Sequence, residues 1–266
     1  MLRLEAISYR HPGAVEDSLH DVSLELPGGT VTGLAGPSES GISSLCLVAG
    51  GLAPRVVGGD LAGEVSVDGE PIAGWPMHRV AEVVVTGLAD PAGQLSLIAD
   101  TVLEEVAFGP ANLGLPHETV LERARASLDR LGIASLAGRD PRRLSTGQQQ
   151  LVVMAGLLAM GPRYLILDAP LAHLDGRSSR LVLDAITAVA VAGVGVLVAD
   201  GHVDAIATIC DDLVILAGGR IVAQGPPDLV LADPGLADLG VDCPGAHLRR
   251  VLAEVGLDPT SAAAAP

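Results

Sequence analysis

The first third of the chain alternates apolar and polar residues with a period of two, which is typical of strands that bury one face. Two runs carry this pattern, and their apolar members are Leu2, Leu4 and Ala6, then Val22, Leu24 and Leu26. A short apolar strand is expected at residues 31–34, followed by a glycine-bounded loop at 36–41 and an apolar helix pattern at 45–52. A strand, a glycine-rich loop and a helix in this order are the layout of a phosphate-binding βα unit.

The middle of the chain predicts helices. Residues 118–132 place five apolar side chains on one helical face before a stop at Gly132, namely Val120, Leu121, Ala124, Leu128 and Leu131. A second helix is expected to start at Ser145. Buried strands are expected at 164–167 and 194–199, and a hairpin is expected at the Gly218-Gly219 turn. Alternating strands and helices predict an α/β fold with a mostly parallel sheet, in which residues 92–160 form a helical insertion.

Composition excludes several classes of function. The chain has 266 residues with 32 acidic and 16 basic side chains, a net charge of −16, so we expect no nucleic-acid partner. Every base is an arginine, and a chain without lysine cannot use lysine chemistry. The mean hydropathy is high, +0.46, yet the longest nearly apolar stretch, 186–199, is shorter than the about 20 residues of a membrane-spanning helix. The N-terminus lacks the apolar segment of a signal peptide, which predicts a cytoplasmic protein.

Three motifs give the chain a family resemblance. They are GPSESGISSL at 36–45, LSTGQQQ at 144–150 and YLILDAPLAHLD at 164–175. In this order and spacing they resemble the Walker A, signature and Walker B to D-loop segments of ABC-transporter ATPases. The stretch TVLEEVAFGPANLGLP at 101–116 resembles the energy-coupling-factor type, the ATPases of cobalt, nickel and vitamin importers, and residues 90–95 and 218–227 fit the same type.

The resemblance implies an architecture. It is the ABC-ATPase fold, a P-loop NTPase core with a mostly parallel sheet, an N-terminal antiparallel β subdomain and an inserted α-helical subdomain. The nucleotide-binding domain would span residues 1–228. Residues 229–266 would form a C-terminal helical extension with a disordered Ala/Pro tail.

The Walker A segment departs from the family at two positions. The resemblance assigns nucleotide binding to Gly36, Ser38, Ser40, Gly41, Ile42, Ser43 and Ser44. Ile42 stands where the family has the phosphate-binding lysine, and Glu39 replaces a glycine. Removing one member of a buried charge pair costs about 3–5 kcal/mol, which is about two to three and a half decades of affinity. We therefore expect weak ATP binding or none here, or a strand-to-helix turn that binds no ligand.

The positions to which the resemblance assigns catalysis are also altered. Asp168 keeps the metal-side carboxylate and, with Ser43, would hold Mg²⁺. Ala169 stands where the family has its catalytic glutamate, and alanine cannot accept a proton. Ala89 takes the place of the Q-loop glutamine. His202 matches the family's switch histidine, although a single histidine at a strand end is also a common structural residue. His11 is placed where an aromatic residue stacks on adenine, with Tyr9 as the alternative.

The signature motif, in contrast, is nearly complete. LSTGQ differs from the family's LSGGQ only at Thr146, and Ser145, Gly147 and Gln148 remain. Ser145 can cap the following helix, and a helix N-terminus is a ready anion site. In the family this end faces the γ-phosphate bound by the opposite subunit. The alternative is an ordinary N-cap before a core helix.

The resemblance thus implies an ATP-binding-cassette subunit of an energy-coupling-factor-type membrane transporter. It would be a degenerate partner that supplies its signature motif to a second, active ABC ATPase subunit, with ATP and Mg²⁺ bound in the assembled complex. The alternative is a non-transport pseudo-ATPase that acts as a scaffold or regulatory module. A polytopic membrane subunit would be contacted through residues 95–115, which places the chain at the inner face of the cell membrane. The pair Glu104-Glu105 is expected on an interface or a solvated face.

Overall fold

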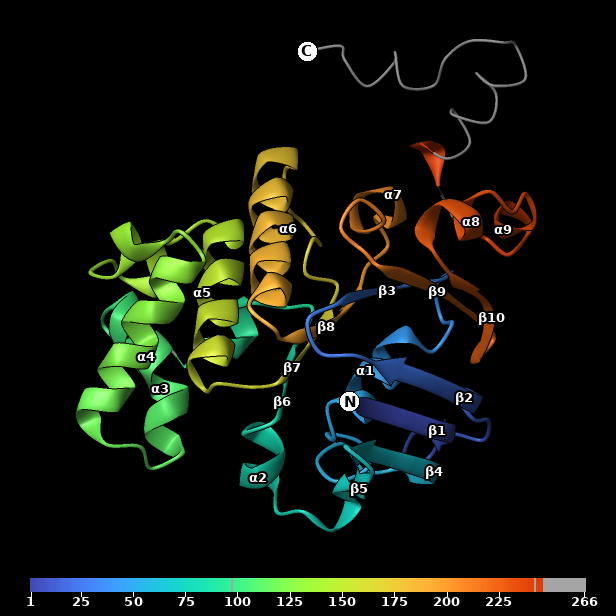
Figure 1. The fold of residues 1–266 in the computed structure, drawn as a ribbon, viewed down its shortest axis with the longest axis horizontal. Helices are drawn as coiled ribbons and strands as arrows, with labels where there is room; N and C mark the ends of the chain where they lie inside the picture. The colour runs from blue at the N-terminus through green and yellow to red at the C-terminus, as the bar shows by residue number, and fades with distance from the viewer. Residues whose placement is uncertain (97, 242, 246–266) are drawn as a thin grey trace.

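The computed structural model describes residues 1–96, 98–241 and 243–245, and it contains two sheets. The smaller sheet is antiparallel and has the order β2-β1-β4-β5. Its strands are β1 (Leu2–Arg10), β2 (Leu19–Leu26), β4 (Asp60–Val67) and β5 (Glu70–Pro71). Figure 1 shows it at the lower right, beside the amino-terminal label. The predicted N-terminal antiparallel sheet is therefore confirmed.

The larger sheet has the order β10-β9-β3-β8-β7-β6. Its strands are β3 (Val31–Ala35), β6 (Val84–Gly87), β7 (Tyr164–Asp168), β8 (Gly195–Ala199), β9 (Asp212–Ala217) and β10 (Arg220–Gly225). All neighbouring pairs are parallel except β9 and β10, which form the hairpin expected at Gly218-Gly219. Both glycines have positive φ, 52° and 72°, as the favoured two-residue hairpin turn requires. The mostly parallel α/β fold is confirmed.

Helices surround this sheet. The longer ones are α1 (Ile42–Ala49), α3 (Val102–Asn112), α4 (His117–Arg130), α5 (Thr146–Ala159) and α6 (Gly176–Val191). Short helices are α2 (Met77–Ala81), α7 (Val203–Ile206), α8 (Pro227–Leu231) and α9 (Gly235–Asp238). In Figure 1, α3, α4 and α5 gather on the left as a helical group, with α6 between them and the sheet. Of the expected C-terminal extension, 229–266, residues 246–266 with the Ala/Pro tail lie outside the described residues, and the domain boundary at residue 228 stays a prediction.

Alternate residues of the central strands supply two cores. Leu165, Val196 and Val198 face the helical side with α5 and α6, whereas Ile166 and Leu197 face α1 and the antiparallel sheet. Strands buried on both faces read as continuous apolar runs, which explains the high mean hydropathy of the chain. No helix within the described residues is long and apolar enough to cross a membrane.

One predicted core position in β1 is wrong. Ala6 is exposed and has a φ of 50°, and the register of β1 against β2 shifts between Leu4 and Ile7, the interval that contains Ala6. This β-bulge turns the following residues over by one position, so Ile7 and Tyr9 are buried instead. The strand keeps its buried face, but the simple alternation ends at Leu4.

An ion pair joins the two sheets through Asp68. The Arg163 guanidinium lies 2.7 Å from its carboxylate, and the amino group of Met1 contacts it as well. Arg163 first, and then the Met1 amine, lower the pKa of Asp68 to about 2. A depressed carboxyl pKa stabilises the folded state above the unfolded value of about 3.9, and the gain is lost as the pH falls through about 2.

We expect Asp68→Asn to lower the melting temperature at pH 7, and we expect the difference from the parent protein to shrink between pH 4 and pH 2. The effect should be modest because the pair is exposed and screened by solvent. Thermal unfolding across that pH range measures it. A difference that stays constant down to pH 2 would contradict the assignment.

Candidate functional site

The loop between β3 and α1 forms a pocket of about 420 Å³, lined by Ser18 and residues 36–44. Glycines give the loop its tight path. A Cβ at Gly36 would lie 2.0 Å from the Leu216 carbonyl oxygen, and one at Gly41, where φ is 97°, would lie 2.4 Å from that of Ser18. Helix α1 begins at Gly41 without a side-chain cap, so its first amides have no partner from a capping side chain.

The charge of this pocket does not suit a nucleotide phosphate. Among the residues that line the pocket, Glu39 carries a charge. Its side chain is exposed, and its φ is 63°. Ile42 begins α1 at the position expected for a lysine. The uncapped helix and the buried, unpartnered hydroxyl of Ser40 remain suited to an anion. Without a cation, and with a carboxylate in its lining, the pocket fits the phosphates of Mg-ATP poorly.

The two predicted magnesium ligands lie together. Asp168, the last residue of β7, is 9% exposed, and the Ser43 hydroxyl hydrogen-bonds to its carboxylate. Burial raises the pKa of Asp168; the Ser43 hydrogen bond opposes that shift, and the charge of Asp200 adds to it. Ala169 follows in a left-handed conformation with a φ of 50°. Its methyl group provides no acceptor for a proton.

The signature segment lies at the N-terminus of α5. Ser145 is the N-cap: its hydroxyl accepts from the Gln148 amide at 3.4 Å, and the Gln148 side-chain oxygen accepts from the Ser145 amide at 3.2 Å. This reciprocal capping box orders the first turn. Gly147 is packed against α6, because a Cβ there would lie 2.7 Å from the Ser178 Cβ. Thr146, between them, is exposed.

The comparisons with known proteins agree with this geometry. The sequence profile of the ABC transporter family matches residues 19–172. A putative ABC transporter ATP-binding protein of Streptomyces coelicolor, SCO2324, is 36% identical over 234 residues, which cover 87% of this chain and 41% of that protein. The energy-coupling factor transporter ATP-binding protein EcfA2 of Symbiobacterium thermophilum is 34% identical over 249 residues, covering 91% and 84% of the two chains.

This chain belongs to the ABC transporter family. Among solved structures, CbiO1 of Clostridium perfringens superposes with a TM-score of 0.78 at 26% identity, covering 94% of this chain and 98% of CbiO1. CbiO1 is described as part of the ABC transporter complex CbiONQ. The chain spans less than half the length of some curated relatives, including SCO2324 and a Streptomyces avermitilis protein of which it covers 44%.

Asp200 organises the end of β8 in this member of the ABC transporter family, and the sequence analysis did not find it. It is 5% exposed, and one carboxylate oxygen accepts from the Leu171 amide at 2.8 Å. The other oxygen lies 2.8 Å from Nδ1 of His202 and accepts from the His202 amide. Asp200 directly follows the buried apolar strand β8, just as Asp168 ends the buried apolar strand β7. An aspartate at the end of a second buried strand was the sequence signal that could have identified Asp200. The exposed imidazole of His202 is thus oriented by Asp200.

Tyr9 and His11 occupy different environments in this cassette. Tyr9 is fully buried, and its hydroxyl donates to the Gly58 carbonyl at 2.7 Å, so its face is not open to a ligand. The His11 Nε2 lies 2.8 Å from the Ser44 hydroxyl oxygen at the pocket lining. The structure therefore places His11, rather than Tyr9, beside the pocket.

A groove of about 260 Å³ lies between α3 and α5 of the cassette, and Phe108 on its rim is 42% exposed. Gln94, Leu95, Val153 and Met160 also line it. Glu104 is exposed, but Glu105 is only 8% exposed, so a solvated face is wrong for Glu105, and its place on an interface stays a prediction. Val102 lies three residues before Glu105 and Val106 lies one residue after it, and both are buried. Helical periodicity therefore already placed Glu105 on the buried face of α3.

Proposed function

We propose that this cassette is a degenerate ATPase subunit of an energy-coupling-factor-type transporter, one that supplies its signature helix to an active partner. The observation that carries the proposal is an asymmetry within the chain. The pocket after β3 has a carboxylate and no cation, whereas α5 keeps its capping box and its close-packed Gly147. In the family, the residues at the first site act on the chain's own nucleotide, and those at the second act across the subunit interface.

The relatives support the transporter type. EcfA2 is named for an energy-coupling factor transporter, and CbiO1 for the CbiONQ complex. By this likeness the chain would assemble with a second ABC ATPase subunit and a polytopic membrane protein, at the inner face of the cell membrane. ATP and Mg²⁺ would bind in the partner's site. There the positive end of α5, with Ser145, Gly147 and Gln148, would face the terminal phosphate.

Purification of the chain from its host under mild detergent tests the assembly. The proposed function predicts that a second ATPase, which has a lysine in its Walker A motif, and a polytopic membrane protein come with it. Recovery of the chain in a stable complex that contains neither would favour the scaffold or regulatory role instead.

The membrane partner is proposed to dock on the groove between α3 and α5. We expect cysteines placed at Phe108 and Asn112, both exposed on α3, to crosslink to the copurified membrane subunit. The matched control is Val191→Cys, which is 83% exposed on α6. Mass spectrometry of the crosslinked products measures the yield. An intact complex in which the α3 cysteines crosslink no better than the control would overturn the docking assignment.

A further inference from the structure

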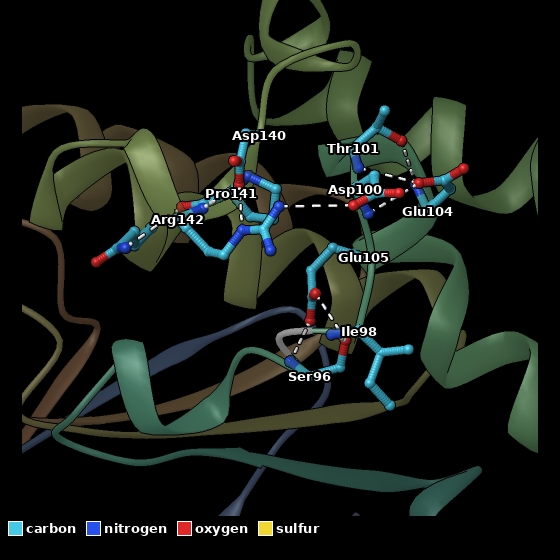
Figure 2. Close-up of polar contacts among 10 residues, drawn as sticks. Ser96, Ile98, Asp100, Thr101, Glu104, Glu105, Asp140, Pro141 and Arg142 are labelled. Carbon is cyan, nitrogen blue, oxygen red and sulfur yellow. Dashed lines mark hydrogen bonds and ion pairs between the residues drawn. The ribbon is translucent and has the colours of Figure 1, made fainter.

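Helix α3 holds a buried carboxylate whose partners come from a single residue outside the helix. One oxygen of Glu105 accepts from the Ser96 amide at 2.6 Å, and the other accepts from the Ser96 hydroxyl at 2.8 Å. Figure 2 shows the Glu105 side chain extending from α3 toward Ser96. Charge-assisted hydrogen bonds of this length are among the stronger ones in proteins. A buried carboxylate requires such partners, so Ser96 and Glu105 fix each other's position.

The Ser96 side chain also bonds to the backbone of Ile98. The Ser96 hydroxyl oxygen accepts from the Ile98 amide at 3.3 Å, and the Ile98 side chain is 78% exposed. The hydroxyl thus joins the carboxylate of α3 to the backbone that carries an exposed apolar residue (Figure 2).

The preceding loop is closed by its own side chain. The Gln94 side-chain oxygen accepts from the Leu88 amide at 2.8 Å, and its amide group donates to the carbonyls of Leu88 and Asp90, at 2.8 and 3.1 Å. Residues 88–94 are therefore held together independently of any ligand. The Glu105–Ser96 contact attaches this closed loop to α3.

The first turn of α3 is bonded to a second segment, the one that leads to the signature. The Val102 amide donates to the Arg139 carbonyl and the Leu103 amide to the Ala137 carbonyl, both at 2.9 Å. These donors are free because the first amides of a helix have no partner within it. Only two residues separate the following 3₁₀ turn, Pro141–Arg143, from the start of α5 at Thr146.

Arg142 adds a side-chain connection between the same segments. Its guanidinium lies 2.8 Å from the Asp140 carboxylate and 3.5 Å from that of Asp100, just before α3 (Figure 2). The pair with Asp100 is exposed and contributes little alone. Together with the two backbone bonds, it leaves α3 in contact with both Ser96 and the approach to the signature.

We propose that Glu105 is a positioning residue that holds Ser96, and through the Ser96 hydroxyl the Ile98 amide, against α3, so that a membrane segment seated on the groove between α3 and α5 moves the signature approach, residues 137–142, together with α3. The movement would reach the partner's nucleotide through the signature helix. This role rests on the proposed function, since it assumes a membrane subunit at the groove.

Hydrogen exchange on the full chain tests the Glu105–Ser96 contact without any partner subunit. Glu105→Ala should speed exchange about tenfold or more at the Ser96 and Ile98 amides and at the Val102 and Leu103 amides that bond residues 137–142. Glu105→Gln should stay near the parent protein, because its amide can accept from the Ser96 amide and donate to the Ser96 hydroxyl oxygen. Glu118→Ala, an exposed carboxylate on α4, is the control. Should Glu105→Ala fail to fold, Ser96→Ala removes only the hydroxyl contacts, and it should speed exchange at the Ile98 amide.

Unchanged exchange at the Ser96 and Ile98 amides of Glu105→Ala would overturn the positioning role of Glu105. Faster exchange there with unchanged exchange at Val102 and Leu103 would overturn the connection to the signature. In the purified complex, Glu105→Ala should keep the subunits together but lose the response of ATP turnover to the membrane subunit, and Glu105→Gln should restore it. If even the parent chain yields no complex, the proposed function fails, while the exchange measurements still decide the role of Glu105.

Discussion

Replacing Thr146 with Asp should lower ATP turnover by the assembled pair about a hundredfold, although Thr146 belongs to the chain whose own nucleotide site we propose to be inactive. Thr146 is the exposed first residue of α5. A carboxylate at a helix N-terminus favours the helix, so the fold of this chain should be unaffected. Across the interface, the same charge about 5 Å from a phosphate costs about 3 kcal/mol at an effective dielectric constant of about 20.

The control is Thr146→Asn, which has nearly the same shape as Asp without its charge. It should leave turnover within a few-fold of the parent complex. Thr146 is a better position than Gly147 for this experiment, because any side chain at Gly147 would meet Ser178 at 2.7 Å and disturb the packing of α5 on α6. Steady-state ATPase measurements on the copurified complex decide the matter. Equal rates for the Asp and Asn variants would mean that the signature helix does not face a nucleotide.

The isolated chain should bind Mg-ATP only weakly and should not hydrolyse it. The missing lysine alone accounts for about two or more decades of affinity, and the Glu39 carboxylate adds repulsion. Isothermal titration calorimetry with Mg-ATP should detect no binding in the low micromolar range. Ile42→Lys alone should change little, because the new ammonium lies in the same pocket as Glu39. Ile42→Lys combined with Glu39→Gly should tighten binding about a hundredfold.

Hydrolysis requires a separate change. Ala169→Glu added to the double variant would restore a group able to polarise water beside the Ser43–Asp168 pair. Asp168→Asn is the control for contaminating ATPases, because their activity would not respond to it. Tight Mg-ATP binding by the parent chain, or turnover that Asp168→Asn abolishes, would contradict the degenerate half-site.

The elements around the site followed from local patterns. The strand and the loop at 31–41 followed from a short apolar run and its bounding glycines, whereas the helix expected at 45–52 lies at Ile42–Ala49, three residues earlier. The start of α5 followed from Ser145, because an N-cap side chain is a local requirement of a helix terminus. Such signals depend on a few neighbouring residues and need no knowledge of the tertiary fold.

The features that were missed depend on distant contacts. The bulge at Ala6 shifts a register by one residue, and the alternation of β1 does not show where that happens. Asp200 has a role only because the Leu171 amide, from another strand's loop, lies beside it. Glu105 was expected on an interface or a solvated face because the family resemblance places its segment toward the membrane subunit, although its helical spacing from Val102 placed it inward. The resemblance and the periodicity disagreed there, and burial was possible because Ser96 provides two donors.

The closure of residues 88–94 by Gln94 has a consequence for how a transporter built on this chain would move. We expect a loop that its own side chain holds together to keep one shape through a nucleotide cycle. If the corresponding loop of the partner ATPase changes conformation with its bound nucleotide, the membrane protein would contact one loop of constant shape and one loop that moves. Each turnover would then tilt that protein about its contact with this chain, rather than shift both contacts symmetrically. The subunit without chemistry would serve as the pivot of the assembly.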